Sequence, residues 1–178
     1  RAAIQADKAR FKALQDRIAE ASPGDTIVVD GGTHRGPFVI DRSLVVLGRN
    51  NPVLLGDEET HVVVIRARGV TISGFTVRGS GTSLEDDHAG ILVRADSAVI
   101  SRNRLVDVLH GIYVKGSNHA RITGNEIVGP PFEERVVTED EAREVGCDVR
   151  GDGGRCEVPL SLARRGNGIH IWKSTGNT

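Results

Sequence analysis

Gly90-Ile91-Leu92-Val93, Gly111-Ile112-Tyr113-Val114 and Gly168-Ile169-His170-Ile171 are three copies of one pattern, and the first two begin 21 residues apart. A second pattern has nearly the same period, because Asn103 and Asn125 are 22 residues apart. Self-similarity at a fixed period of this length is the signature of a solenoid, in which every repeat forms one coil.

Each period holds about three short runs rich in Val and Ile, with apolar residues at alternate positions and Gly, Asn or Asp between the runs. This pattern is typical of short strands separated by turns. It disfavours the competing leucine-rich or helical repeat. The sequence therefore predicts an all-β fold, a right-handed single-stranded parallel β-helix.

Stacked coils of such a fold place equivalent side chains on one another, so the periods predict ladders. Two apolar ladders are expected to be buried, and they comprise Ile91, Ile112 and Ile169, and Val93, Val114 and Ile171. Asn103 and Asn125 occupy a turn position where stacked asparagines can bond to each other.

The first residues follow a different period: Ile4, Phe11, Leu14 and Ile18 recur at helical spacing. We expect residues 1–22 to form a helix that caps the solenoid, because an open β-helix end exposes unpaired backbone groups. Residues 23–178 are expected to form the coils. The chain stops inside a coil, which suggests a fragment of a longer solenoid.

The composition fits a folded, extended domain, with 38% hydrophobic residues, 22 glycines and a formal net charge of −1. This charge provides no general attraction for nucleic acid, so no nucleic-acid partner is expected. No apolar run approaches the 18 or so residues that would span a membrane.

Two insertions, residues 80–88 and 130–165, follow Gly79 and Gly129, which hold equivalent positions in their coils. Both loops are therefore expected to leave the solenoid at the same corner. The strands after this corner are predicted to present two rows of outward side chains, the first formed by Leu92, Tyr113 and His170 and the second by Arg94, Lys115 and Trp172.

The corner combines several side chains with chemical potential. His88, His110 and His170 are candidate metal ligands, because imidazole suits copper, although isolated histidines are more often ordinary surface residues. Arg94, Tyr113, Lys115 and Trp172 are candidates for binding a sugar or a partner, or they simply cover the sheet. Cys147 and Cys156 suit a disulfide across a hairpin or, when reduced, a soft metal. Residues 138–145 begin with a helix-capping pattern.

Several segments resemble the β-helical maturation factors of nitrous oxide reductase (NosD type), a carbohydrate-binding and sugar-hydrolase-like β-helix family. They are Pro23 to Val29, Arg35 to Asp41, Gly79-Ser80-Gly81, Gly111 to Gly116 and Gly166-Asn167-Gly168-Ile169-His170-Ile171-Trp172. The resemblance implies a periplasmic accessory protein of denitrification that is not an enzyme. It implies work with an ABC transporter and a copper-donating lipoprotein to deliver copper to the reductase. Export would also favour the Cys147–Cys156 disulfide.

The rival hypothesis is a polysaccharide lyase or epimerase that acts on an acidic sugar polymer. In that scheme Arg94 or Lys115 neutralises the uronate, and Tyr113 or His170 moves the adjacent proton. A calcium-dependent lyase groove, however, needs outward carboxylates on consecutive strands, and the equivalent positions hold Leu92, Tyr113 and His170. A purely structural adhesin coil is the third alternative.

Overall fold

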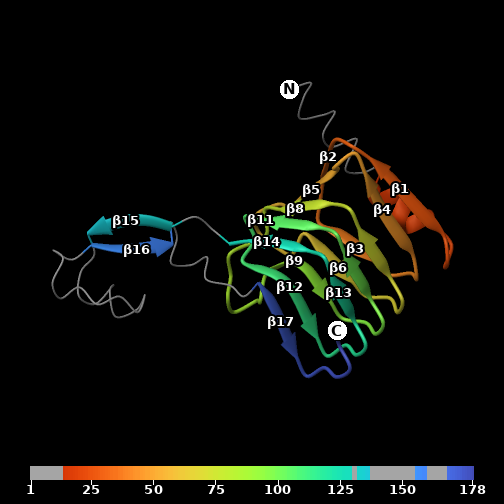
Figure 1. Cartoon of the computed structure of the whole chain (residues 1–178). Coiled ribbons are helices and arrows are strands. Elements are labelled where there is room, and N and C mark those ends of the chain that lie inside the picture. Colours follow the sequence, from red (N-terminus) through yellow and green to blue (C-terminus); the bar gives the residue numbers. More distant parts are fainter. Residues whose placement is uncertain (1–13, 130–131, 137–154, 160–167) are drawn as a thin grey trace.

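The chain folds into stacked coils whose strands form three parallel sheets (Figure 1), and the computed structural model describes residues 14–129, 132–136, 155–159 and 168–178. Sheet A contains, in order, β1 (Thr26–Asp30), β4 (Val45–Arg49), β7 (Thr71–Ser73), β10 (Val99–Ser101) and β13 (Arg121–Thr123). Sheet B contains β2 (Thr33–Arg35), β5 (Val53–Leu55), β8 (Thr76–Arg78), β11 (Arg104–Val106) and β14 (Glu126–Val128). Sheet C contains β3 (Phe38–Ile40), β6 (Val63–Ile65), β9 (Ala89–Val93), β12 (His110–Lys115) and β17 (Ile169–Trp172).

Every sheet takes one strand from each successive coil, which is the defining feature of a parallel β-helix. The sequence-based prediction of this fold class is confirmed. The second insertion adds a feature that the sequence analysis missed. Strands β15 (Phe132–Val136) and β16 (Arg155–Pro159) pair antiparallel with each other and with no other described strand.

The core lies inside the coils and is built from the predicted ladders. Ile91 is in register with Ile112, as Val93 is with Val114, and all four side chains are fully buried. Ladders of this kind bury apolar area without needing large side chains, which suits a chain with only 3% aromatic residues.

The ladder prediction was wrong for its last rung. Ile169 and Ile171 are in register with Ile112 and Val114, but their exposed fractions are 48% and 49%. The physical reason is their position on β17, the edge strand of sheet C, over which no further described strand stacks.

The asparagine ladder is confirmed at the turn between sheets A and B. The Asn103 side chain accepts a hydrogen bond from the Phe75 N–H (3.1 Å) and donates to the Ile72 carbonyl (3.2 Å). It also donates to the Asn125 side-chain oxygen at 3.1 Å. Asn103 thereby satisfies backbone groups that the turn would otherwise bury without partners.

The N-terminal end is capped as expected by a helical segment over residues 14–20. Its Leu14 and Ile18 side chains join the core of the coils. The Gln15 amide exchanges two hydrogen bonds with the backbone of Val39 on edge strand β3, at 3.1 and 3.3 Å. These bonds close an edge that would otherwise be free to pair with another chain. Residues 1–13 lie outside the described part, so the extent of the capping helix, residues 1–22, stays a prediction.

Replacing Ile112 by Asp should abolish cooperative folding, because a charge without a partner in the stacked core costs several kcal/mol, comparable with the stability of a whole domain. Circular dichroism and thermal melting measure the effect. Thr123→Asp, at an exposed position of β13, is the control and should melt close to the wild type. An Ile112→Asp protein that kept its thermal midpoint would refute the ladder.

Asn103→Ala should destabilise the protein by about 2–3 kcal/mol, because it leaves the Phe75 N–H and the Ile72 carbonyl buried without their side-chain partner. Denaturant unfolding gives the free energy. Thr123→Ala, a truncation at an exposed position of β13, is the control and should cost less than about 1 kcal/mol. Equal losses at both sites would contradict the structural role of the ladder.

Candidate functional site

The candidate site is the corner where the chain passes from sheet B to sheet C. Gly79 follows β8 and Gly129 follows β14, and the register of β8, β11 and β14 makes these positions equivalent. The equivalence of Gly79 and Gly129 agrees with the prediction, whereas most of the second insertion lies outside the described residues. Residues 57–61, between β5 and β6, form a further loop at this corner that the sequence analysis missed.

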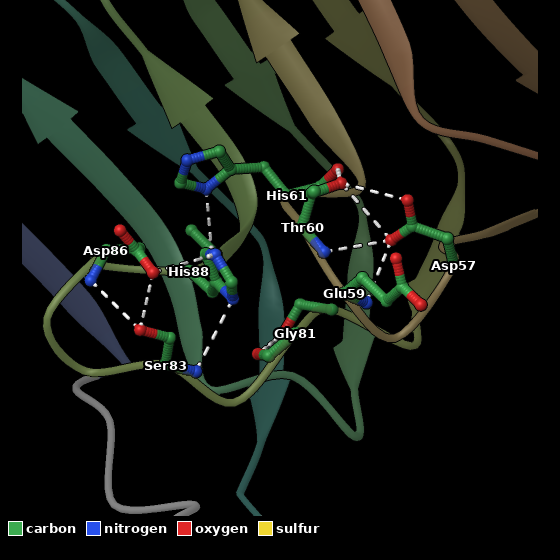
Figure 2. A network of polar contacts seen from close by, with 10 residues as sticks. Asp57, Glu59, Thr60, His61, Gly81, Ser83, Asp86 and His88 are labelled. Atoms are coloured by element: carbon green, nitrogen blue, oxygen red, sulfur yellow. Dashed lines mark hydrogen bonds and ion pairs between the residues drawn. The ribbon is translucent and has the colours of Figure 1, made fainter.

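The loop of residues 57–61 is shaped by one carboxylate (Figure 2). Asp57 Oδ1 accepts hydrogen bonds from the backbone N–H groups of Glu59 (3.0 Å) and Thr60 (2.9 Å). Burial raises the pKa of this carboxyl, but the bonds from Glu59 and Thr60 more than offset burial and leave the pKa below its usual value. An aspartate followed three residues later by a threonine was the available sequence signal for this turn. The turn delivers His61 to the corner.

The loop of residues 80–88 is held by its own polar contacts. Ser83 Oγ donates to Asp86 Oδ2 at 2.7 Å and accepts from the Asp86 N–H at 3.1 Å (Figure 2). Ser80 Oγ accepts from the Leu109 N–H at 2.9 Å, which joins this loop to the following turn. Gly81 packs so closely against Glu59 that an added Cβ would lie 2.6 Å from its carbonyl. The loop of residues 80–88 therefore contacts the backbone of the loop of residues 57–61 directly.

His61 and His88 face each other from these two loops, with ring centroids 5.5 Å apart (Figure 2). His61 Nδ1 accepts the Ala89 N–H at 3.0 Å, and His88 Nδ1 accepts the Ser83 N–H at 3.4 Å. Each neutral ring therefore carries its proton on Nε2. In His88 this nitrogen lies 3.9 Å from Asp86 Oδ2.

The surroundings of His61 keep its ring neutral. Burial is the largest cause, and the nearby His88 and Arg94 add to it, so the pKa of His61 falls from 6.5 to about 4. His61 thus works as a fixed hydrogen-bond acceptor that ties the loop of residues 57–61 to the start of β9.

Asp87 ties the loop of residues 80–88 to the outer face of sheet C. Its Oδ2 lies 2.9 Å from Lys115 Nζ, and its carboxylate also accepts from the Tyr113 hydroxyl. Burial raises the pKa of Asp87, but Lys115, Tyr113 and His110 together outweigh it and lower the pKa. The same contact raises the pKa of Tyr113, for which burial is the largest cause and Asp87 the next.

Two residues of the predicted outward row are covered rather than exposed. Leu92 and Tyr113 are on the outer face of sheet C, yet their exposed fractions are 2% and 3%. They form a small second cluster with Val64 and Ala89, against which Val39 packs. Leu92 and Tyr113 therefore lie on the outer face as predicted, but other side chains cover them there. Tyr113 offers no open ring face for stacking in this conformation.

Strands β12 and β17 carry a group of neighbouring aromatic and imidazole rings, to which Tyr113 belongs. The His170 ring is 4.6 Å from the Tyr113 ring, 5.7 Å from the His110 ring and 6.5 Å from the Trp172 ring, measured between centroids. His110 is buried, and this burial, followed by the charge of His170, lowers the pKa of His110. Trp172 is 51% exposed. The His170 ring therefore lies near the buried rings of Tyr113 and His110 and also near the exposed indole of Trp172.

The donor set fits a three-histidine copper site poorly. Within the described ranges no three His, Cys, Asp or Glu side chains group as metal ligands. A metal-bound histidine normally donates its second N–H, whereas His88 accepts at Nδ1 and keeps its proton on Nε2. Of these three histidines, His110 and His170 are the two whose rings approach each other. The copper assignment of His88, His110 and His170 stays a prediction.

The remaining predicted residues divide by accessibility. Arg94 is exposed, as is Trp172, whereas Lys115 is engaged by Asp87. Cys156 is on β16, but Cys147 lies outside the described residues, so their disulfide stays a prediction. The expected helix at 138–145 also lies outside them.

The fold and the corner define a parallel β-helix protein with a loop-built surface site, and the described residues contain no helix able to cross a membrane. Two curated relatives are similar to the chain, and both are named probable ABC transporter binding protein NosD. The protein from Stutzerimonas stutzeri is 26% identical over 147 residues, which are 82% of this chain and 28% of the relative. The protein from Pseudomonas aeruginosa is 27% identical over 143 residues, 79% of this chain and 27% of the relative.

The chain thus spans little more than a quarter of these relatives, and the similarity supports NosD-like character at most. No family model matches the sequence. No solved structure matches it either.

His61→Gln should remove a pH-dependent component of stability while keeping an acceptor for the Ala89 N–H. In the wild type the unfolded chain takes up a proton near pH 6.5 and the folded chain only near pH 4. The stability contributed above pH 6.5 is therefore lost as the pH falls through this window, by about 1–2 kcal/mol after solvent screening. Denaturant unfolding at several pH values measures the loss.

Thr123→Gln, at an exposed position of β13, gives the control, because it removes no titratable group and should leave the pH dependence of the unfolding free energy as it is in the wild type. A His61→Gln protein with the wild-type slope between pH 6.5 and 4 would show that His61 is not the buried neutral base.

Proposed function

We propose that the chain is a NosD-like accessory protein of the periplasm that helps to assemble the copper sites of nitrous oxide reductase by docking partner proteins on the outer face of sheet C, beside the corner between sheets B and C. The observation that carries this proposal is the exposed Trp172 at the end of β17, whose ring lies 6.5 Å from that of His170. Nitrous oxide reductase, the ABC transporter subunits and the copper-donating lipoprotein are the proposed partners.

The chemistry of this surface suits docking. An exposed indole on a strand loses little conformational freedom on binding and contributes a large contact area, which is why tryptophan dominates many interfaces. Lys173 Nζ lies 5.9 Å from the Trp172 ring centroid, which adds a charge beside the apolar surface. β17 is held in register by its pairing with β12, which limits the order that is lost when a partner binds.

Copper is the cargo in this proposal. The residues that would contact it are His110 and His170, since imidazole nitrogen suits copper. The sequence contains no methionine, so it offers no thioether ligand to Cu(I).

The enzymatic alternative receives less support from the geometry. A lyase or epimerase needs a base that can reach the sugar, but Tyr113 is covered, donates to Asp87 and has a raised pKa. The outer positions of sheet C beside it, Leu92 and Val64, carry no acid or base. An accessory role without catalysis is the proposal that fits these residues.

Trp172→Ala should weaken binding of apo nitrous oxide reductase, or of whichever proposed partner binds, by about tenfold or more, the effect expected of a central aromatic anchor. Surface plasmon resonance with the immobilised chain measures this against each partner in turn. Val28→Ala, which truncates an exposed apolar side chain on sheet A, is the matched control and should change the dissociation constant by less than about twofold. Absence of binding to all three partners, or equal losses in both variants, would overturn the proposal.

A further inference from the structure

A row of cationic side chains crosses the outer face of sheet C. Ile65 pairs with Val93, and Val93 with Val114, so the residues that follow them occupy one outward position on three successive coils. Those residues are Arg66, Arg94 and Lys115, and the next in the row is Trp172, which pairs directly with Lys115. Strands β6, β9, β12 and β17 lie side by side in Figure 1. Neighbouring strands are about 4.8 Å apart, so the charges are stacked closely.

Two of the three cations in this row have no ion-pair partner within the described part of the chain. Lys115 pairs with Asp87 at 2.9 Å, but neither Arg66 nor Arg94 has a carboxylate within ion-pair distance there. Asp41 holds the same position on the preceding coil and lies 3.8 Å from Arg42 instead. Like charges at facing positions of adjacent strands are destabilising.

The positive charge extends into the corner. Arg94 and Lys115 both contribute, after burial and His88, to the low pKa of His61. Both arginines are exposed, and the backbone beneath them is held by bonds from the Arg66 N–H to Ile40 and from the Arg94 N–H to Ile65. The cations are therefore mounted on the rigid sheet rather than on the loops.

We propose that Arg66, Arg94 and Lys115, with Trp172 at the end of the row, form a docking surface for an acidic segment of a partner protein. Arginine and lysine only donate hydrogen bonds, and the guanidinium group matches carboxylates in a two-bond geometry, so the row selects acidic side chains. This inference depends on the docking function proposed above in one respect only, namely that the partner is a protein. This inference adds Arg66 to the site, because Arg66 belongs neither to the loops of the corner nor to the group of rings.

A protein segment fits the row better than an acidic polysaccharide does. Sugar polymers bind to aromatic faces repeated along a groove, but Tyr113 is covered and Trp172 is the one exposed aromatic residue of the row. An extended acidic peptide needs only the charges and one apolar anchor. Such a contact should associate faster at low salt, because exposed charges steer the encounter.

The experiment measures binding of fluorescent poly-L-glutamate to the chain by anisotropy at several salt concentrations, with polygalacturonate as competitor. The double reversal Arg66→Glu with Arg94→Glu should weaken binding of poly-L-glutamate by about tenfold or more at low salt. The control reverses two exposed arginines on the other sheets, Arg78→Glu with Arg121→Glu, and changes the net charge equally. It should stay within about twofold of the wild type.

Circular dichroism and melting establish that both variants fold. Absence of binding to poly-L-glutamate, or equal losses in the two variants, would overturn the assignment of the row. Displacement by polygalacturonate at lower concentration than by unlabelled poly-L-glutamate would overturn the choice of a protein partner. Failure of the reductase, transporter and lipoprotein to bind, with poly-L-glutamate binding intact, would remove the proposed function and leave the acidic docking surface standing.

Discussion

The in-register stacking of parallel strands is the constraint on which the rest of this structure depends. Because each strand bonds to its equivalent one coil away, the core and the outer faces are built from rows of equivalent positions. Inside, the rows hold Ile and Val, which bury apolar surface by stacking. Outside, the same rule aligns residues distant in sequence, such as Arg66 with Arg94 and Tyr113 with His170.

The register also explains why the site is at one corner. A loop of any length is tolerated where a strand of sheet B ends, since the coil resumes in register at sheet C. Residues 57–61 and 80–88 use this freedom and then fix themselves to the coils, through the His61 bond to Ala89 and the Asp87 bond to Lys115. These bonds give the two loops a defined position against the coils.

Periodicity predicted the coils, the inward ladders, the asparagine ladder and the shared corner, because each follows from spacing alone. It failed where the exposure of a side chain depends on which other residues cover it. Tyr113 was assigned correctly to the outer face, but the position of the Asp87 carboxylate over it has no signal in the period. Ile169 has the ladder sequence but is exposed on an edge strand. The hairpin of β15 and β16 lies inside an insertion, where the repeat gives no information.

The same limit applies to the histidines. Spacing brought His88 and His110 to one corner, yet only the hydrogen-bond partners of Nδ1 indicate that His88 supports the loop. His61 was missed because residues 57–61 are too few to stand out as an insertion. The surface on which the proposed docking role rests combines an indole, an imidazole and arginines.

Hydrogen–deuterium exchange of the chain, alone and with bound apo nitrous oxide reductase, tests the central claim most directly, because it maps the contact surface without any substitution. The account predicts slower exchange in residues 57–61 and 79–88 and along β17, with sheet A unchanged. Slower exchange confined to sheet A, or none at the corner in a mixture where the complex forms, would contradict it.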